Sequence, residues 1–205
     1  MFKKVRWFLF VLLAITVGLY PVMYFLVDRE FGLLSTKSAE LLANVFWNAG
    51  FYTHIIFGGL ALLTGWLQFS ASFRNQNLPI HRLLGKIYLV CAVLSATAGF
   101  AIGFFATGGI VAATGFISLA IIWFTTTLKA YFHIREKQVN AHRKWMTFSY
   151  AACFAAVTLR LWLPLLSAVF KDFTTAYIIV AWMCWAPNLA VAYFLTKRYE
   201  VSGKI

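Results

Sequence analysis

Two histidine-arginine pairs are the first residues whose types and spacing suit chemistry, and they lie at His81-Arg82 and His142-Arg143. Imidazole ligates iron and guanidinium binds carboxylates, so such a pair suits a cofactor that carries carboxylates. A b-type haem fits this description, with His81 and His142 as iron ligands and with Arg82, Arg143 and Tyr88 completing the site. The alternatives are a phospholipid headgroup, another anion, or plain anchoring of the basic residues at a membrane surface.

A third imidazole and one further cation, His54 and Arg160, lie within apolar segments. An ionisable side chain inside a membrane is costly, so it indicates a functional site. We expect Arg160 to bind an anionic or carbonyl-bearing ligand with His54 nearby, unless it reaches outward to the headgroups. The side chains expected to complete this ligand site are Tyr52, Gln68, Thr158 and Trp162.

The composition determines the elements that must position these residues. The chain of 205 residues is 62% hydrophobic and 12% charged, which is too apolar for a soluble surface. Each membrane crossing takes about 20 apolar residues in a helix. The sequence therefore predicts one all-α membrane domain over 1–205, with spans near 7–27, 48–70, 87–106, 110–128, 145–168 and 173–196.

The net charge of +12 indicates the orientation of these spans. Placing both termini in the cytoplasm puts all but four of the 18 Lys and Arg on that side, as the positive-inside rule requires. The exceptions are Arg29, Lys37 and Lys171 outside and Arg160 within a span. Basicity is thus a property of topology, and no nucleic-acid partner is expected. We expect the first span to be an uncleaved anchor, because no Ala-x-Ala site follows it.

Small and polar residues recur at helical spacing in three spans, which indicates the faces where helices pack. We expect spans two to five to form a four-helix core around these faces. In the fifth span, His142 and Arg160 share one face about 27 Å apart if the helix is unbroken. The faces are His54, Gly58, Ala61, Gly65, Gln68 and Ser72; Cys91, Ser95, Gly99 and Gly103; and His142, Ser149, Cys153 and Arg160. Weaker ones are Thr114, Ser118 and Thr125, and Tyr177, Cys184 and Asn188.

Several chemistries are excluded by what the sequence lacks. It contains no Walker motif, no GxSxG elbow, no HExxH pair and no paired carboxylates within a span, which argues against hydrolases and nucleotide-driven mechanisms. Whether the protein is an enzyme stays open.

The motifs resemble a family of multi-pass bacterial membrane proteins known only as a domain of unknown function. They cover about residues 48–168 and include His81-Arg82-x-x-Gly85-Lys86-x-Tyr88 and His142-Arg143-x-Trp145-Met146. The resemblance implies membrane location and marks His54, His81, His142 and Arg160 as signature residues. More distantly, the layout is similar to the cytochromes b561, in which histidines on successive helices of a four-helix core hold two haems. For a second haem, the helix opposite His54 offers no histidine.

Three functions therefore remain. The first, which we favour, is a cytochrome-like redox or electron-transfer subunit that binds a b-type haem or a quinone. The second is a transporter or lipid- or anion-binding protein that uses Arg160 and His54. The third is an accessory subunit whose polar faces only fix helix packing.

Overall fold

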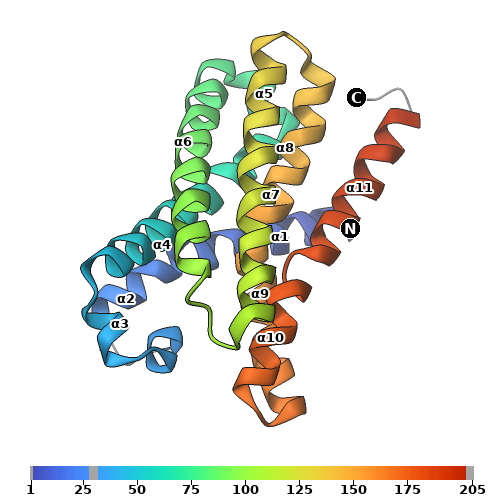
Figure 1. Ribbon diagram of the computed structural model, residues 1–205. Helices are drawn as coiled ribbons and strands as arrows, with labels where there is room; N and C mark the ends of the chain where they lie inside the picture. Colours follow the sequence, from blue (N-terminus) through green and yellow to red (C-terminus); the bar gives the residue numbers. More distant parts are fainter. Residues whose placement is uncertain (1, 28–31, 202–205) are drawn as a thin grey trace. The chain divides into compact units, whose positions relative to one another are not determined.

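The computed structural model describes residues 2–27 and 32–201, and in this part of the chain all regular secondary structure is helical (Figure 1). The prediction of an all-α protein is thereby confirmed. The helices are α1 (Phe2–Leu19), α2 (Met23–Leu26), α3 (Ala39–Ala43), α4 (Val45–Gly65), α5 (Ala71–Gln76), α6 (Leu78–Gly103), α7 (Gly109–Arg135), α8 (Val139–Cys153), α9 (Ala155–Phe170), α10 (Phe173–Met183) and α11 (Ala186–Val201). Short 3₁₀ turns occupy Tyr20–Val22, Gly32–Thr36 and Trp66–Phe69.

Six helical segments among the described residues are long and apolar enough to cross a membrane, which confirms the expected number of spans. Several extend beyond the expected boundaries, since polar residues at a helix end can lie at the interface, outside the hydrocarbon. The third begins nine residues before its expected start, and the fourth ends at Arg135 instead of near residue 128. The segments are Lys4–Leu26, Val45–Phe69, Leu78–Gly103, Gly109–Arg135, Val139–Phe170 and Phe173–Lys197.

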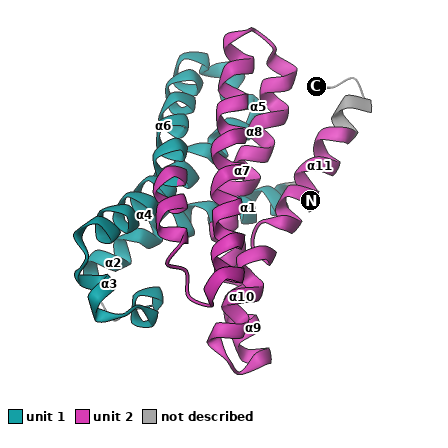
Figure 2. Ribbon diagram, viewed as in Figure 1, with its two compact units in different colours: residues 1–95 teal, residues 96–205 magenta. Residues whose placement is uncertain are grey.

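The chain divides into two compact units, Met1–Ser95 and Ala96–Ile205 (Figure 2). The boundary falls within α6, which is one continuous helix. The expected core of spans two to five draws on both units and stays a prediction, as does the single domain.

In unit 1, α1 packs on α4 through two glycines. A Cβ atom at Gly59 would lie 2.5 Å from the carbonyl oxygen of Gly18, so only glycine permits this approach. Helix α4 and the turn after it also meet α6, at Gly58 with Ser95 and at Gln68 with Gly85. Ten residues separate the two contacts on each segment, so the helices run antiparallel in one register. These are the small and polar faces expected for spans two and three.

In unit 2, α7 packs against α8 and α10, while α9 packs against α10 and α11 against α8. The approach of α10 to α7 again depends on glycine, because a Cβ atom at Gly115 would lie 2.8 Å from the carbonyl oxygen of Ala181. Gly108 has a φ of +94° in the turn before α7, a conformation that favours glycine.

The fifth and sixth spans are each interrupted near the middle, at Phe154 and at Cys184-Trp185. Pro187 explains the second interruption, because it lacks the N–H that would continue the helix. Within a membrane the carbonyl groups at such breaks need other partners. Asn188 Nδ2 donates to the carbonyl oxygens of Ala151 (3.3 Å) and Cys184 (3.0 Å), and the Thr158 hydroxyl also donates to Cys184. Side chains from α9 and α11 thus donate hydrogen bonds to carbonyl groups at both interruptions.

Candidate functional site

His54, on α4, is held by the backbone of α6. Its Nδ1 lies 2.9 Å from the Ser95 carbonyl oxygen, and the Ser95 hydroxyl donates to the His54 carbonyl oxygen at 2.8 Å. A carbonyl oxygen can only accept, so Nδ1 of His54 carries the proton. In the neutral imidazole, Nε2 then keeps its lone pair and can ligate a metal or accept a hydrogen bond. Gly58 makes room for this pair, since its Cβ atom would lie 3.0 Å from Ser95 Oγ.

His142, on α8, is held in the same way by α7. Its Nδ1 lies 2.8 Å from the carbonyl oxygen of Ala130. The same argument places the proton on Nδ1 and the lone pair on Nε2. Metal-ligating histidines commonly donate the other ring N–H to a backbone carbonyl or carboxylate, which fixes the tautomer and the ring orientation. His54 and His142 both meet this requirement.

The α7–α8 pair that carries His142 is joined by two further polar contacts. The hydroxyls of Thr127 and Ser149 lie 2.6 Å apart and both residues are buried, while Lys129 Nζ lies 4.4 Å from the centre of a Trp145 ring. These contacts join α7 and α8 into a helical hairpin that carries His142.

The face of the fourth span that was predicted to point inward is wrong, because other positions of this helix are buried. Thr114 and Thr125 are exposed and donate to carbonyl groups of their own helix. The buried face passes instead through Ala120, Trp123 and Thr127. Hydroxyl residues did not mark the buried face of this span, whereas an Ala-Trp-Thr spacing of three and four residues does.

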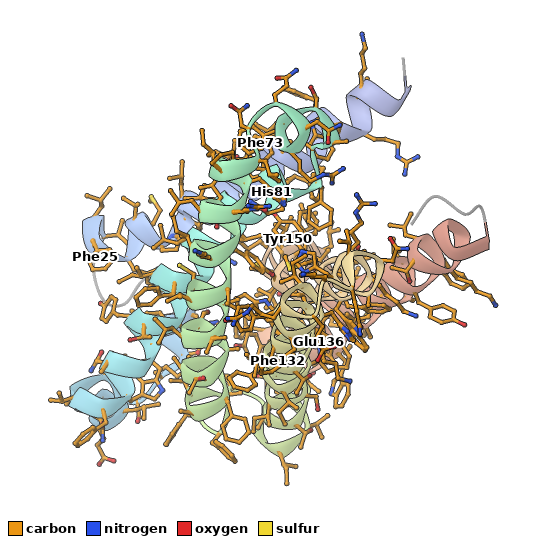
Figure 3. All side chains as sticks on the ribbon, turned by 90° about the horizontal axis from the view of Figure 1, so that it is seen from above. Phe25, Phe73, His81, Phe132, Glu136 and Tyr150 are labelled. Atoms are coloured by element: carbon orange, nitrogen blue, oxygen red, sulfur yellow. The ribbon has the colours of Figure 1, made fainter. Side chains whose placement is uncertain are left out.

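The other candidates of unit 1 lie at different depths. His81 is the fourth residue of α6, and Figure 3 shows it near the start of that helix, with Phe73 on the neighbouring α5. Fourteen residues separate His81 from Ser95, the partner of His54, which is about 21 Å along α6. His54 and His81 therefore cannot ligate one iron. Tyr88 is buried, whereas Arg82 is exposed.

Gln68 and Tyr52 are both half-buried in unit 1. Gln68 turns its Oε1 toward Gly85 of α6, and its buried Nε2 has no hydrogen-bond partner in the described part of the chain. Tyr52 contacts the rings of Phe25 and Phe51 at centroid distances of 5.3 and 5.4 Å. Tyr52 thus belongs to an aromatic cluster as well as to the expected ligand site.

In unit 2, Arg160 turns back along its own helix. Its Nη1 donates to the Ala156 carbonyl oxygen at 2.9 Å, which directs the guanidinium toward the middle of the span. This orientation disfavours the alternative in which Arg160 reaches the outer headgroups. His142 and Arg160 share one face only if the fifth span is an unbroken helix. The interruption at Phe154 shows that this condition is not met. Trp162 and Arg143 are exposed, and Thr158 bonds to Cys184 and Asn188.

Two proposed juxtapositions join residues from different units. His81 belongs to unit 1 and His142 to unit 2, and His54 and Arg160 are divided in the same way. Both pairings stay predictions from the sequence.

The ligating side chains available limit which metal ion or cofactor the histidines could bind. Among the described residues, no group of three or more His, Cys, Asp or Glu could bind a metal ion. Haem needs only one or two axial ligands from the protein, because its macrocycle supplies the other nitrogen atoms. Isolated, oriented imidazoles therefore fit haem better than a metal held by protein ligands alone.

Six apolar helical segments with polar side chains at their contacts define a multi-pass α-helical membrane protein, in contact with the lipid bilayer. The chain belongs to the family described as "Predicted membrane protein (DUF2306)", whose model matches residues 51–196. This confirms the resemblance to a multi-pass membrane protein family of unknown function and extends it into the sixth span, whereas the similarity to the cytochromes b561 stays a prediction. Comparison with the curated proteins and with the solved structures finds no match.

Proposed function

We propose that this protein is a redox or electron-transfer subunit of a bacterial cytoplasmic membrane, with both termini cytoplasmic, that binds b-type haem through histidine. His142 Nε2 is the principal iron ligand, and His54 Nε2 is the corresponding ligand in unit 1. The sequence predicts that His81 and His142 ligate the same iron. The observation that carries the proposal is the carbonyl contact at Nδ1 of both His54 and His142.

The residues of this chain would act as ligands and counter-charges. Ala130 and Ser95 hold the two imidazoles in the tautomer that exposes a lone pair at Nε2, and this also raises ligand basicity. Arg82 and Arg143, each next to a histidine, supply the cations that propionate groups require. When bound, haem supplies reversible one-electron chemistry.

Haemin titration of the detergent-purified protein and of three histidine variants tests this proposal. We expect the wild type to develop a Soret band with saturable stoichiometry and His142→Ala to lose most of it. His54→Ala should lower the stoichiometry. His133→Ala is the matched control, because His133 is not a proposed ligand and its Nδ1 contacts the Gln138 side chain at 2.6 Å. Equal titrations in His142→Ala, His54→Ala and wild type would refute the proposal.

Anion binding at Arg160 is the second candidate, favoured by the inward turn of its guanidinium. Arg160→Lys keeps the charge but loses the planar geometry that binds an oxyanion with two hydrogen bonds. Binding of an anionic lipid should then fall in Arg160→Lys and fall further in Arg160→Ala. Equal binding by all three proteins would exclude this candidate.

A further inference from the structure

The indole N–H of Trp47 has no hydrogen-bond partner among the described residues. Trp47 is the third residue of α4, its side chain is 6% exposed, and Nε1 is fully covered. By contrast, Trp182 and Trp185 donate to the carbonyl oxygens of Val111 (3.1 Å) and Ala181 (2.8 Å). A buried donor without a hydrogen-bond partner costs about 1–3 kcal/mol, because it loses its hydrogen bonds to water and gains none in return. A buried group of this kind needs an explanation, and a ligand with an acceptor atom is one.

Trp47 lies at one end of an aromatic cluster, in which it contacts Phe51. The rings of Trp47 and Phe51 are stacked, with centroids 5.3 Å apart and an interplanar angle of 12°. Tyr24 meets Phe51 edge-on at 5.3 Å, and Tyr52 and Phe25 extend the cluster. Figure 3 labels Phe25, which is itself exposed at the margin of this aromatic cluster. Aromatic rings prefer stacked and edge-on aromatic partners, so a ligand with a planar ring suits this cluster better than one without.

The aromatic cluster lies in line with His54. Trp47 and His54 are seven residues apart on α4, so they share a face about 10 Å apart along the axis. A ligand at Trp47 would therefore lie on the same side of α4 as the imidazole of His54.

We propose that the aromatic cluster binds the headgroup of a membrane quinone, with a quinone carbonyl accepting a hydrogen bond from Trp47 Nε1. A quinone has both chemical features that this cluster favours in a ligand, namely a planar ring and a carbonyl acceptor. A lipid ester also has a carbonyl acceptor but has no ring to lie against Trp47 or Phe51. This inference deepens the proposed redox function, since a quinone is a lipid-soluble electron partner for a cofactor held at His54.

Calorimetric titration with ubiquinone-1 tests the inference, with methyl decanoate as the ester probe. We expect saturable ubiquinone-1 binding by the wild type and binding about five- to tenfold weaker in Trp47→Phe, which loses one hydrogen bond. Trp182→Phe is the control and should bind as the wild type does. Equal affinities in Trp47→Phe and wild type, or equal binding of methyl decanoate and ubiquinone-1, would overturn the inference.

Unfolding with and without ubiquinone-1 gives an independent readout. Trp47→Phe removes an unpaired donor but leaves a cavity, so its stability without ligand reports both effects. Ubiquinone-1 should raise the melting temperature of the wild type and of Trp182→Phe more than that of Trp47→Phe, and equal shifts in all three proteins would refute the inference. If Trp47→Phe does not fold, Phe51→Leu removes the stacked ring, and undiminished ubiquinone-1 affinity in that variant would also refute it.

Haemin titration of the same samples separates the two proposals. Quinone binding without a Soret band would refute only the haem proposal. A Soret band without quinone binding would refute only the quinone site.

Discussion

The ring nitrogens of His54 and His142 carry the chemistry that we assign to this protein at the scale of single residues. Both Nδ1 atoms face a backbone carbonyl of a neighbouring helix, at 2.9 and 2.8 Å. The sequence placed these histidines on inward faces, which was correct for the α4–α6 contact. It could not identify the Ser95 and Ala130 carbonyls as partners, because every residue carries a carbonyl and only the helix register selects one.

Replacing Gly59 by alanine tests the closest backbone approach. The new Cβ atom would lie 2.5 Å from the Gly18 carbonyl oxygen, which cannot rotate away as a side chain can. We expect a loss of about 1–3 kcal/mol in unfolding free energy, measured by titration with dodecyl sulfate. Gly85→Ala is the control, because its Cβ atom meets only the Gln68 side chain at 3.5 Å. Equal stability of Gly59→Ala and Gly85→Ala would contradict the described α1–α4 contact.

At the scale of elements, the interruptions of the fifth and sixth spans were not predicted from the sequence. Pro187 signalled the second break, but no proline or glycine lies at Phe154. Pro164 lies ten residues later, inside α9. The break at Phe154 depends on tertiary partners, since Asn188 and Thr158 satisfy the carbonyl groups there and in the facing helix. Such partners are not visible in a local pattern.

A double-mutant cycle over Thr127→Val and Ser149→Ala tests the α7–α8 contact. We expect a coupling energy of about 0.6 to 1.7 kcal/mol, the range for hydrogen bonds between membrane helices. Thr125→Val should show no coupling to Ser149→Ala, because Thr125 is exposed and bonds within its own helix. Coupling as weak for Thr127 as for Thr125 would contradict the 2.6 Å contact between the two hydroxyls.

The cap of α10 gives stability a defined pH dependence. Asp172 accepts a hydrogen bond from the Thr175 backbone N–H at 2.7 Å, and its bonds with Thr175, the side-chain bond first, lower the pKa of Asp172. A carboxyl group whose pKa is lower in the folded state stabilises the fold above its unfolded pKa of about 3.9, and this contribution is lost as the pH falls. Asp172→Asn keeps a capping oxygen without the charge.

Melting temperatures at pH 5 and pH 3 measure this effect. Wild type should lose more stability than Asp172→Asn between these two values. Parallel losses in the two proteins would show that the Asp172 carboxylate is not favoured in the folded state.

At the scale of the whole molecule, hydropathy and length were enough to predict six spans and an all-α fold, because a helix that crosses lipid must be long and apolar. Charge predicts the orientation of those spans. Reporter fusions measure it directly: a fluorescent protein joined after Lys137 or at the C-terminus should fluoresce in the cytoplasm. Alkaline phosphatase joined after Thr107 or Lys171 should be active outside. The opposite pattern would contradict the positive-inside orientation.

The claim that His142 and His54 are prepared as haem ligands is tested most directly by the reduced-minus-oxidised absorption spectrum of the protein purified from its native membrane. We expect a Soret band and a sharp α band of b type, both diminished in His142→Ala. A flat difference spectrum, unchanged after haemin is added, would contradict it.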